Sequence, residues 1–165
     1  MESIFHRTST RKYLDKEVEP EKVLQILKAG MQAPSACNQQ PWEFYVVTNP
    51  EKIEALSKAT EYSMCVAHAK IVIVPVYRKN DLIAPSYVQI DMAIAQENMW
   101  LEADHLGLGG VMIGIAPKED RMKTVHDILE LPDDVCAFSL FPIGYPAKEK
   151  VQQDRFEENR IHYLK

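Results

Sequence analysis

Two arginine-containing segments near opposite ends of the chain carry the side chains best suited to a phosphate-bearing ligand. The first is Arg7-Thr8-Ser9-Thr10-Arg11, and the second contains Arg155, Arg160 and His162. Guanidinium groups present planar, paired donors to a phosphate, and hydroxyl groups can hydrogen-bond a sugar-like chain. The pattern is compatible with a phosphate site, and arginines on a solvated face are the usual explanation for it.

A polar loop at residues 33–42 is a second candidate for ligand contact. Pro34 and Pro41 keep the residues before them out of helical dihedrals. Four side chains between them suit the edge of a planar polar ring: Ser35, Asn38, Gln39 and Gln40. An ordinary connector with local turn hydrogen bonds fits the same residues. We expect Cys37 in this loop to be a small packing residue and not a nucleophile.

Other sites with recognisable motifs are not indicated. Gly107-Leu108-Gly109-Gly110 lacks the third glycine of a dinucleotide fingerprint, and it follows a helical pattern where that fingerprint follows a strand. No phosphate-loop motif and no His-Glu-x-x-His zinc motif occurs. The scattered histidines and the three widely spaced cysteines predict neither a metal site nor a disulfide framework.

Composition restricts the class of protein. The chain of 165 residues has 19 basic and 24 acidic side chains, a net charge of −5, which argues against a nucleic-acid-binding protein. Neither a leader pattern nor an apolar run of about 20 residues is present, so we expect no membrane span. We expect a single domain over 1–165, located in the cytoplasm, where reduced cysteines are usual.

Four stretches predict the helices behind these segments. Pro20 suits a first helical turn, and an apolar stripe follows it until the chain reaches Pro34. A second helix begins with Asn49 as its cap, and Pro117 opens another. Residues 86–106 predict one long helix that is apolar on more than one side, which favours a helix shared with a partner subunit.

Four shorter runs predict strands, at residues 43–48, 71–77, 110–115 and 136–143. Pro75 lies inside the second run and cannot donate to a sheet ladder, so it indicates an edge strand or a bulge. Residues 147–165 have no clean period, which is typical of a frayed tail or of an arm that lies on another subunit.

Together these segments resemble the FMN-dependent nitroreductase family over nearly the whole chain. The resemblance rests on five segments that occur in the family's order: Arg7 to Tyr13; Ala33 to Trp42; Gly107 to Gly114; Pro142 to Pro146; and Arg155 with Ile161-His162-Tyr163. It implies an α+β fold with a central, mostly antiparallel sheet between helices. It also implies a homodimer with FMN at the subunit interface and a C-terminal arm, about 147–165, exchanged between subunits.

The resemblance also assigns cofactor-binding residues by position. Arg7, Ser9 and Arg155 would hold the FMN phosphate and ribityl chain, with Thr8 beside them, and Arg11 would lie near flavin N1 and the C2 carbonyl. Pro34, Ser35 and Asn38 would approach the flavin from the other subunit. Met112, Ile113 and Gly114 would run along the ring, with a backbone N–H near N5. No separate catalytic residue is implied, because flavin N5 carries the chemistry.

The activity implied is an NADH- or NADPH-dependent reduction of a small-molecule acceptor, nitroaromatic or quinone-like, by ping-pong hydride transfer. A flavin, enone or dehalogenating reductase on the same scaffold is an alternative, as is a non-catalytic flavin-binding redox module. The chain departs from the usual family pattern at Thr8, Gly110 and Gln153, which is expected to weaken phosphate binding. The connector from Arg78 to Pro85 is too short for the helical excursion that covers the site in larger relatives.

Overall fold

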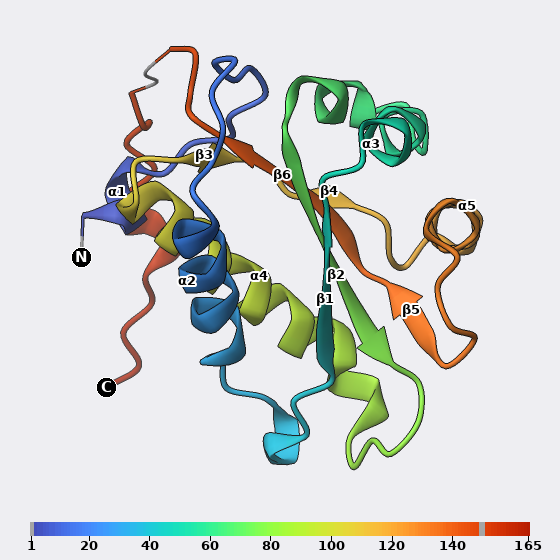
Figure 1. Ribbon diagram of the computed structural model, residues 1–165. Coiled ribbons are helices and arrows are strands. Elements are labelled where there is room, and N and C mark those ends of the chain that lie inside the picture. The colour runs from blue at the N-terminus through green and yellow to red at the C-terminus, as the bar shows by residue number, and fades with distance from the viewer. Residues whose placement is uncertain (1, 149–150) are drawn as a thin grey trace.

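An antiparallel sheet lies between two layers of helices in the computed structural model, which describes residues 2–148 and 151–165 (Figure 1). The strands follow the order β1-β2-β6-β3, with β5 beside β2 and β4 beside β6, and all these pairs are antiparallel. The predicted α+β fold with a mostly antiparallel sheet is therefore confirmed. The strand bounds are β1 Trp42–Val47, β2 Ile71–Arg78, β3 Gly109–Gly110, β4 Ile113–Gly114, β5 Val135–Ala137 and β6 Ser139–Gly144.

Helices cover both faces of the sheet (Figure 1). The first layer contains α2 and α4, and the second contains α3 and α5. Alternate residues of β2 face the two layers, because side chains along a strand point to opposite faces. Ile71 and Ile73 pack with α2 and α4, whereas Val72 and Val74 pack with α3 and α5. The helix bounds are α1 Ser3–His6, α2 Pro20–Met31, α3 Pro50–Leu56, α4 Val88–His105 and α5 Glu119–Leu129.

The predicted helices occur where the sequence placed them. Helix α2 begins at Pro20, and the side chain of Asn49 accepts the Lys52 N–H at 3.0 Å as the cap of α3. Helix α4 buries a stripe of side chains that starts at Val88 and ends at Met99, and Gly107 follows the helix with a φ of 74°. Its other side carries Ile90, which is 55% exposed. The second apolar face of α4 is therefore left at the surface of this chain.

The predicted strand at 110–115 was wrong as a single element. It consists of β3 and β4, which keep one register along β6, with Gly110 opposite Ile143 and Ile113 opposite Leu140. This register brings Val111 opposite Pro142, which has no N–H to donate. The ladder is interrupted there, and the chain between the two short strands is released from sheet pairing.

The predicted strand at 136–143 is also divided, into β5 and β6, and Phe138 lies between them. Two residues of β2 separate Ile73 from Val76, whereas three residues separate their partners Phe141 and Ala137. The extra residue makes a β-bulge opposite Pro75. The bulge predicted from Pro75 is confirmed, and the edge-strand alternative is wrong, because β2 has neighbours on both sides.

The bulge also anchors the chain after β4. The Phe138 N–H donates to the Pro75 carbonyl at 2.9 Å, and the Phe138 carbonyl accepts the N–H groups of Ile115 at 3.1 Å and Ala116 at 2.9 Å. The end of β4 at Gly114 is therefore fixed to the centre of the sheet.

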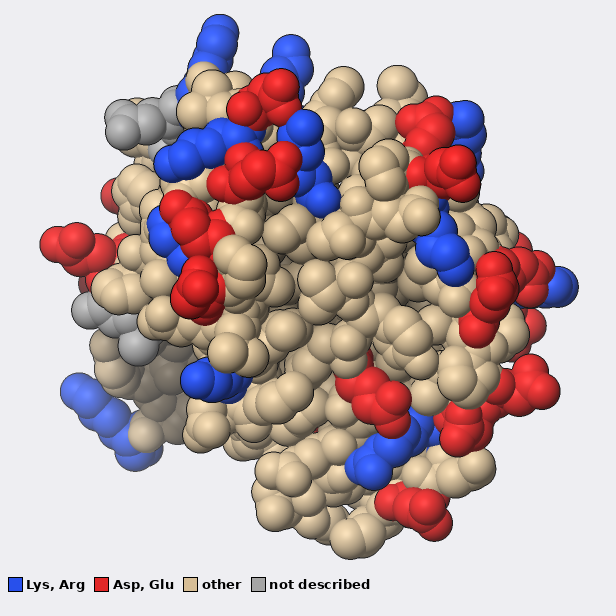
Figure 2. Space-filling view, in the orientation of Figure 1, with Lys and Arg blue, Asp and Glu red and all other residues tan. Residues whose placement is uncertain are grey.

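Acidic and basic side chains are interspersed around the rim of the face in Figure 2, and its centre carries almost no charge. Among the described residues, no helix is long and apolar enough to cross a membrane.

The predicted arm at 147–165 includes residues 149 and 150, which lie outside the described residues. From Val151 onward most of its residues are exposed, including Phe156 and Tyr163.

Replacing Gly110 by alanine should destabilise the fold. A Cβ there would lie 2.5 Å from Cε2 of the buried Phe141 ring and 3.0 Å from the Pro142 carbonyl. We expect the free energy of unfolding, measured by urea denaturation, to fall by about 1–3 kcal/mol. Gly114→Ala is the matched control, because its Cβ would meet nothing closer than the Ala116 carbonyl at 4.0 Å. Equal losses in the two variants would contradict the packing of β3 described here.

Candidate functional site

The arginine-containing N-terminal segment lies along β3. Ser9 forms a parallel bridge with Gly110, and the Thr10 N–H donates to the Gly110 carbonyl at 2.9 Å. A Cβ at Gly109 would overlap the Thr10 side chain, so this approach requires the glycine. The Tyr13 hydroxyl donates to the Thr10 and Pro142 carbonyls at 2.8 and 3.0 Å, and burial raises the pKa of Tyr13. The segment is thereby fixed at both ends to the edge of the sheet.

Arg7 extends from this segment onto α4. Its guanidinium carbon lies 4.0 Å from the centroid of the Trp100 ring, and its Nε lies 3.5 Å from Oε1 of Glu97. Partial burial raises the pKa of the Glu97 carboxyl, and the charge of Arg7 offsets part of that rise. The side chain of Arg7 is only 15% exposed. The Arg7 guanidinium is therefore fixed against α4 and is not a solvated surface charge.

Arg11 is exposed and lies toward the short helix η2 at Ser63–His68. Its charge lowers the pKa values of Cys65 and Tyr13, although burial outweighs it and leaves both raised. Thr8 and Ser9 are partly buried between the two arginines. The backbone from Arg7 to Arg11 thus runs beside β3, with the Arg7 side chain on α4 and the Arg11 side chain toward η2.

The chain from Met112 to Gly114 continues away from β3 along the same edge. Met112 is partly buried against α4, the Ile113 side chain is buried in the core, and Gly114 is exposed. Space above the Gly114 backbone is open, because a Cβ there would meet only the Ala116 carbonyl, at 4.0 Å. The Gly114 backbone is therefore accessible on the side where a side chain would stand.

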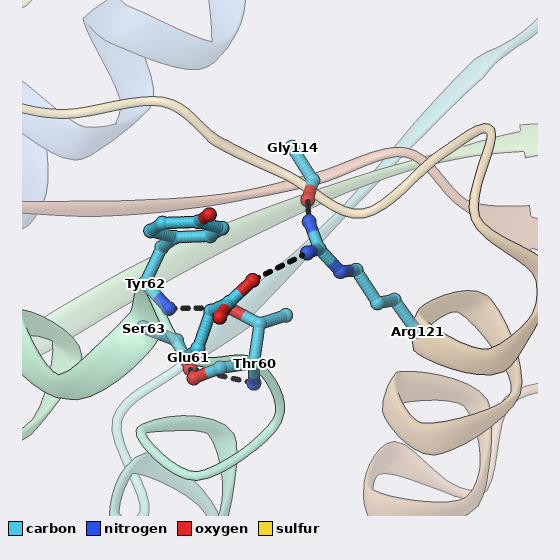
Figure 3. Close-up of polar contacts among 6 residues, drawn as sticks. All are labelled: Thr60, Glu61, Tyr62, Ser63, Gly114 and Arg121. Atoms are coloured by element: carbon cyan, nitrogen blue, oxygen red, sulfur yellow. Dashed lines mark hydrogen bonds and ion pairs between the residues drawn. The ribbon is translucent and has the colours of Figure 1, made fainter.

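A further polar cluster reaches Gly114 from α5 and from the turn before η2, and no sequence motif had indicated it (Figure 3). Arg121 Nη1 donates to the Gly114 carbonyl at 3.4 Å, and Nη2 lies 3.5 Å from Oε1 of Glu61. The Arg121 guanidinium carbon is 5.4 Å from the centroid of the Tyr62 ring. The cluster places a cation and an aromatic ring at the edge of the open backbone.

The polar loop at 33–42 is held by a buried carboxylate of α4. Asp91 accepts the Ala36 N–H at 2.9 Å and the Gln39 side-chain amide at 2.6 Å. Gln39 also bonds both backbone groups of Ala84 and is buried, so it supports the loop and cannot serve as the ligand contact proposed from sequence. The packing role expected for Cys37 was also wrong, because Cys37 is exposed at a φ of 52°.

The remaining predicted residues of this loop face solvent. Pro34 and Asn38 are exposed, and the partly buried Ser35 hydroxyl accepts the Gln40 N–H at 3.0 Å. Figure 1 shows the loop, which includes η1 at Ala36–Asn38, at the opposite end of α4 from α1 and β3. Within one chain the structure therefore separates Pro34, Ser35 and Asn38 from the Arg7 to Arg11 segment.

Arg155 lies on the exposed C-terminal arm. The arm meets the N-terminal segment where the Gln152 side-chain amide donates to the Arg7 carbonyl at 2.6 Å. Arg160 forms a bidentate pair with Glu157 of the same arm, at 2.9 and 2.8 Å. Among the described residues, no group of histidine, cysteine and acidic side chains could hold a metal ion.

The nitroreductase family model matches residues 4–78 and 61–145, which together cover most of the chain. The chain belongs to the nitroreductase family. A protein of Methanothermobacter thermautotrophicus named "Putative NADH dehydrogenase/NAD(P)H nitroreductase" is 38% identical over 165 residues, 100% of this chain and 86% of the relative.

Solved structures agree with the fold of this nitroreductase. An "FMN-dependent Nitroreductase" from Clostridium difficile has a TM-score of 0.91 at 29% identity, over 99% of this chain and 98% of that one. A nitroreductase from Desulfovibrio desulfuricans, described as "in complex with fmn", has a TM-score of 0.85 at 26% identity, over 99% and 95% of the two chains. These matches support the architecture, and the roles of single residues in this nitroreductase stay predictions.

Removing the Asp91 carboxylate should loosen the polar loop of this nitroreductase. In Asp91→Ala the Ala36 N–H and the buried Gln39 amide lose their acceptor, so we expect the free energy of unfolding to fall by about 2–4 kcal/mol. Asp127→Ala is the control, because the exposed Asp127 carboxylate pairs only with the nearby Lys123 and His126 side chains and its loss should cost less than about 1 kcal/mol. Similar urea midpoints for the two variants would contradict the support given by Asp91.

Proposed function

We propose that this protein is an FMN-dependent NAD(P)H oxidoreductase that reduces nitroaromatic or quinone-like acceptors as a homodimer. The observation that carries the proposal is the continuity of one edge of the sheet. Arg7, Ser9 and Arg11 lie beside β3, and the open backbone of Gly114 follows a few residues farther along. A cationic, hydroxyl-bearing end next to an exposed glycine backbone matches a ligand with a phosphate, a polyol chain and a planar ring.

FMN fits the donors present. Arg7, Ser9 and Arg155, with Thr8 beside them, would hold its phosphate and ribityl chain, and Arg11 would favour the anionic reduced ring by its charge. Met112, Ile113 and Gly114 would lie along the ring. When bound, FMN supplies hydride transfer at N5, from NADH or NADPH to the acceptor in a ping-pong sequence. For a quinone, NAD(P)H and one proton give the quinol and NAD(P)+; for a nitro group, the first such step gives the nitroso compound and water.

The position of the polar loop supports the homodimer. Pro34, Ser35 and Asn38 lie at the opposite end of α4 from the Arg7 to Arg11 segment that would hold the FMN phosphate, so we place them at the site of the second subunit. The exposed apolar face of α4 around Ile90 and the exposed arm offer surface that a second copy would cover. FMN would then lie at the subunit interface.

The visible spectrum of the purified protein tests the proposed function directly. We expect a yellow protein whose flavin bands bleach when NADH or NADPH is added without oxygen, and whose colour returns when a quinone or a nitroaromatic compound follows. Gel filtration of the same sample should give the mass of two chains. A colourless protein that binds no added FMN would show that the proposal is wrong.

Arg155→Ala tests the contribution of the arm. Loss of a charged donor to a phosphate should raise the dissociation constant for FMN roughly tenfold, measured by quenching of flavin fluorescence. Arg160→Ala is the matched control on the same arm, because Arg160 is paired with Glu157 and should leave the constant within about twofold. Unchanged FMN affinity in Arg155→Ala would contradict the placement of Arg155.

A further inference from the structure

Arg121 retains unused capacity to bind an anion at the edge of Gly114 (Figure 3). Its two polar contacts are 3.4 Å to the Gly114 carbonyl and 3.5 Å to Glu61. Both are longer than the roughly 2.8 Å of a charge-assisted hydrogen bond. The Glu61 side chain is 69% exposed and that of Arg121 is 24% exposed, so a carboxylate from solvent could replace the weak contact with Glu61.

Tyr62 provides an aromatic surface beside this cation. Its side chain is among the exposed large hydrophobic ones, at 65%. The turn that carries it is nevertheless well anchored, since the Tyr62 N–H donates to the Thr60 hydroxyl at 3.1 Å and the Thr60 N–H to the Ser63 hydroxyl at 2.9 Å. The buried Ser63 hydroxyl donates in turn to the Ser57 carbonyl at 3.0 Å. An ordered turn thus presents a ring to solvent, a typical feature of a surface that stacks with another aromatic group.

The three features define the shape and charge of a ligand. Gly114 leaves open the backbone along which FMN would lie, Tyr62 adds an aromatic wall, and Arg121 adds a positive charge at the rim. A planar aromatic molecule that carries a carboxylate satisfies all three, because its ring can stack on the bound flavin beside Tyr62 while the carboxylate reaches the guanidinium. A neutral molecule of the same shape lacks the last contact.

We propose that Arg121 and Tyr62 form an acceptor subsite that selects planar aromatic acceptors bearing a carboxylate over neutral acceptors of the same shape. The inference rests on the proposed function, because an acceptor bound here can be reduced only if FMN lies along Gly114. Glu61 opposes the selection, since its carboxylate competes with that of the acceptor for Arg121.

Steady-state kinetics of the FMN-bound protein with two matched acceptors test the subsite. The measured quantity is the ratio of kcat/KM for 4-nitrobenzoate to kcat/KM for nitrobenzene. We expect Arg121→Gln to lower this ratio about tenfold, Arg121→Lys to restore most of it, and Glu61→Gln to raise it about twofold. Lys123→Gln is the control on the same helix, because Lys123 pairs with Asp127 and should leave the ratio unchanged.

A binding measurement without turnover gives a second readout. Benzoate titrated into the oxidised, FMN-bound protein should perturb the flavin absorbance, and its dissociation constant should rise about tenfold in Arg121→Gln but not in Lys123→Gln. An FMN-bound Arg121→Gln protein with an unchanged ratio and unchanged benzoate affinity overturns the subsite alone. So does a change confined to KM for NAD(P)H, which would assign Arg121 to the donor. A protein that binds no FMN overturns the proposed function and the subsite together.

Discussion

The arrangement of the candidate site depends on a close contact between the backbone of the N-terminal segment and the backbone of β3, with no side chain between them. Gly109 and Gly110 leave room for Thr10 on one side and for the Phe141 ring on the other, and a Cβ at either glycine would collide with its neighbour. The N-terminal segment can therefore join the edge of the sheet through Ser9 and Thr10. This contact fixes where Arg7 and Arg11 lie, and it covers an edge strand that would otherwise expose unpaired backbone groups.

Helix α4 supports two regions of the site that are distant in one chain. Asp91 holds the polar loop near the start of the helix, whereas Glu97 and Trp100 hold Arg7 farther along it. At 1.5 Å of rise per residue, Asp91 and Trp100 are about 13 Å apart along the axis. A two-fold dimer that packs α4 antiparallel against its copy would place the loop of one chain near the arginines of the other. Because such an interface is self-complementary, one helix would serve both sites.

Periodicity and capping residues predicted most elements, because they depend on neighbours in sequence. Asn49 and Pro20 are examples, as is the bulge inferred from Pro75. The break between β3 and β4 was missed because it arises from Pro142 on another strand. Gln39 and Asn38 have similar polar side chains, and only Asp91, 52 residues beyond Gln39, decides that Gln39 is buried. Arg121 and Glu61 are 60 residues apart and form no motif, so only the fold reveals their meeting at Gly114.

The bulge at Phe138 has a consequence for how the sheet assembles. The Pro75 carbonyl can accept a hydrogen bond from the neighbouring strand, but Pro75 has no N–H to donate in return. The bulge places Phe138 opposite Pro75, where its N–H donates to the Pro75 carbonyl and no return bond is needed. If the partner strand slipped by one residue, one of its carbonyls would face the proline ring, which has no N–H to donate. Every side chain of the slipped strand would also point to the opposite face of the sheet. The proline thus discriminates against misaligned pairing, and correct alignment also brings Phe138 within reach of Ile115 and Ala116.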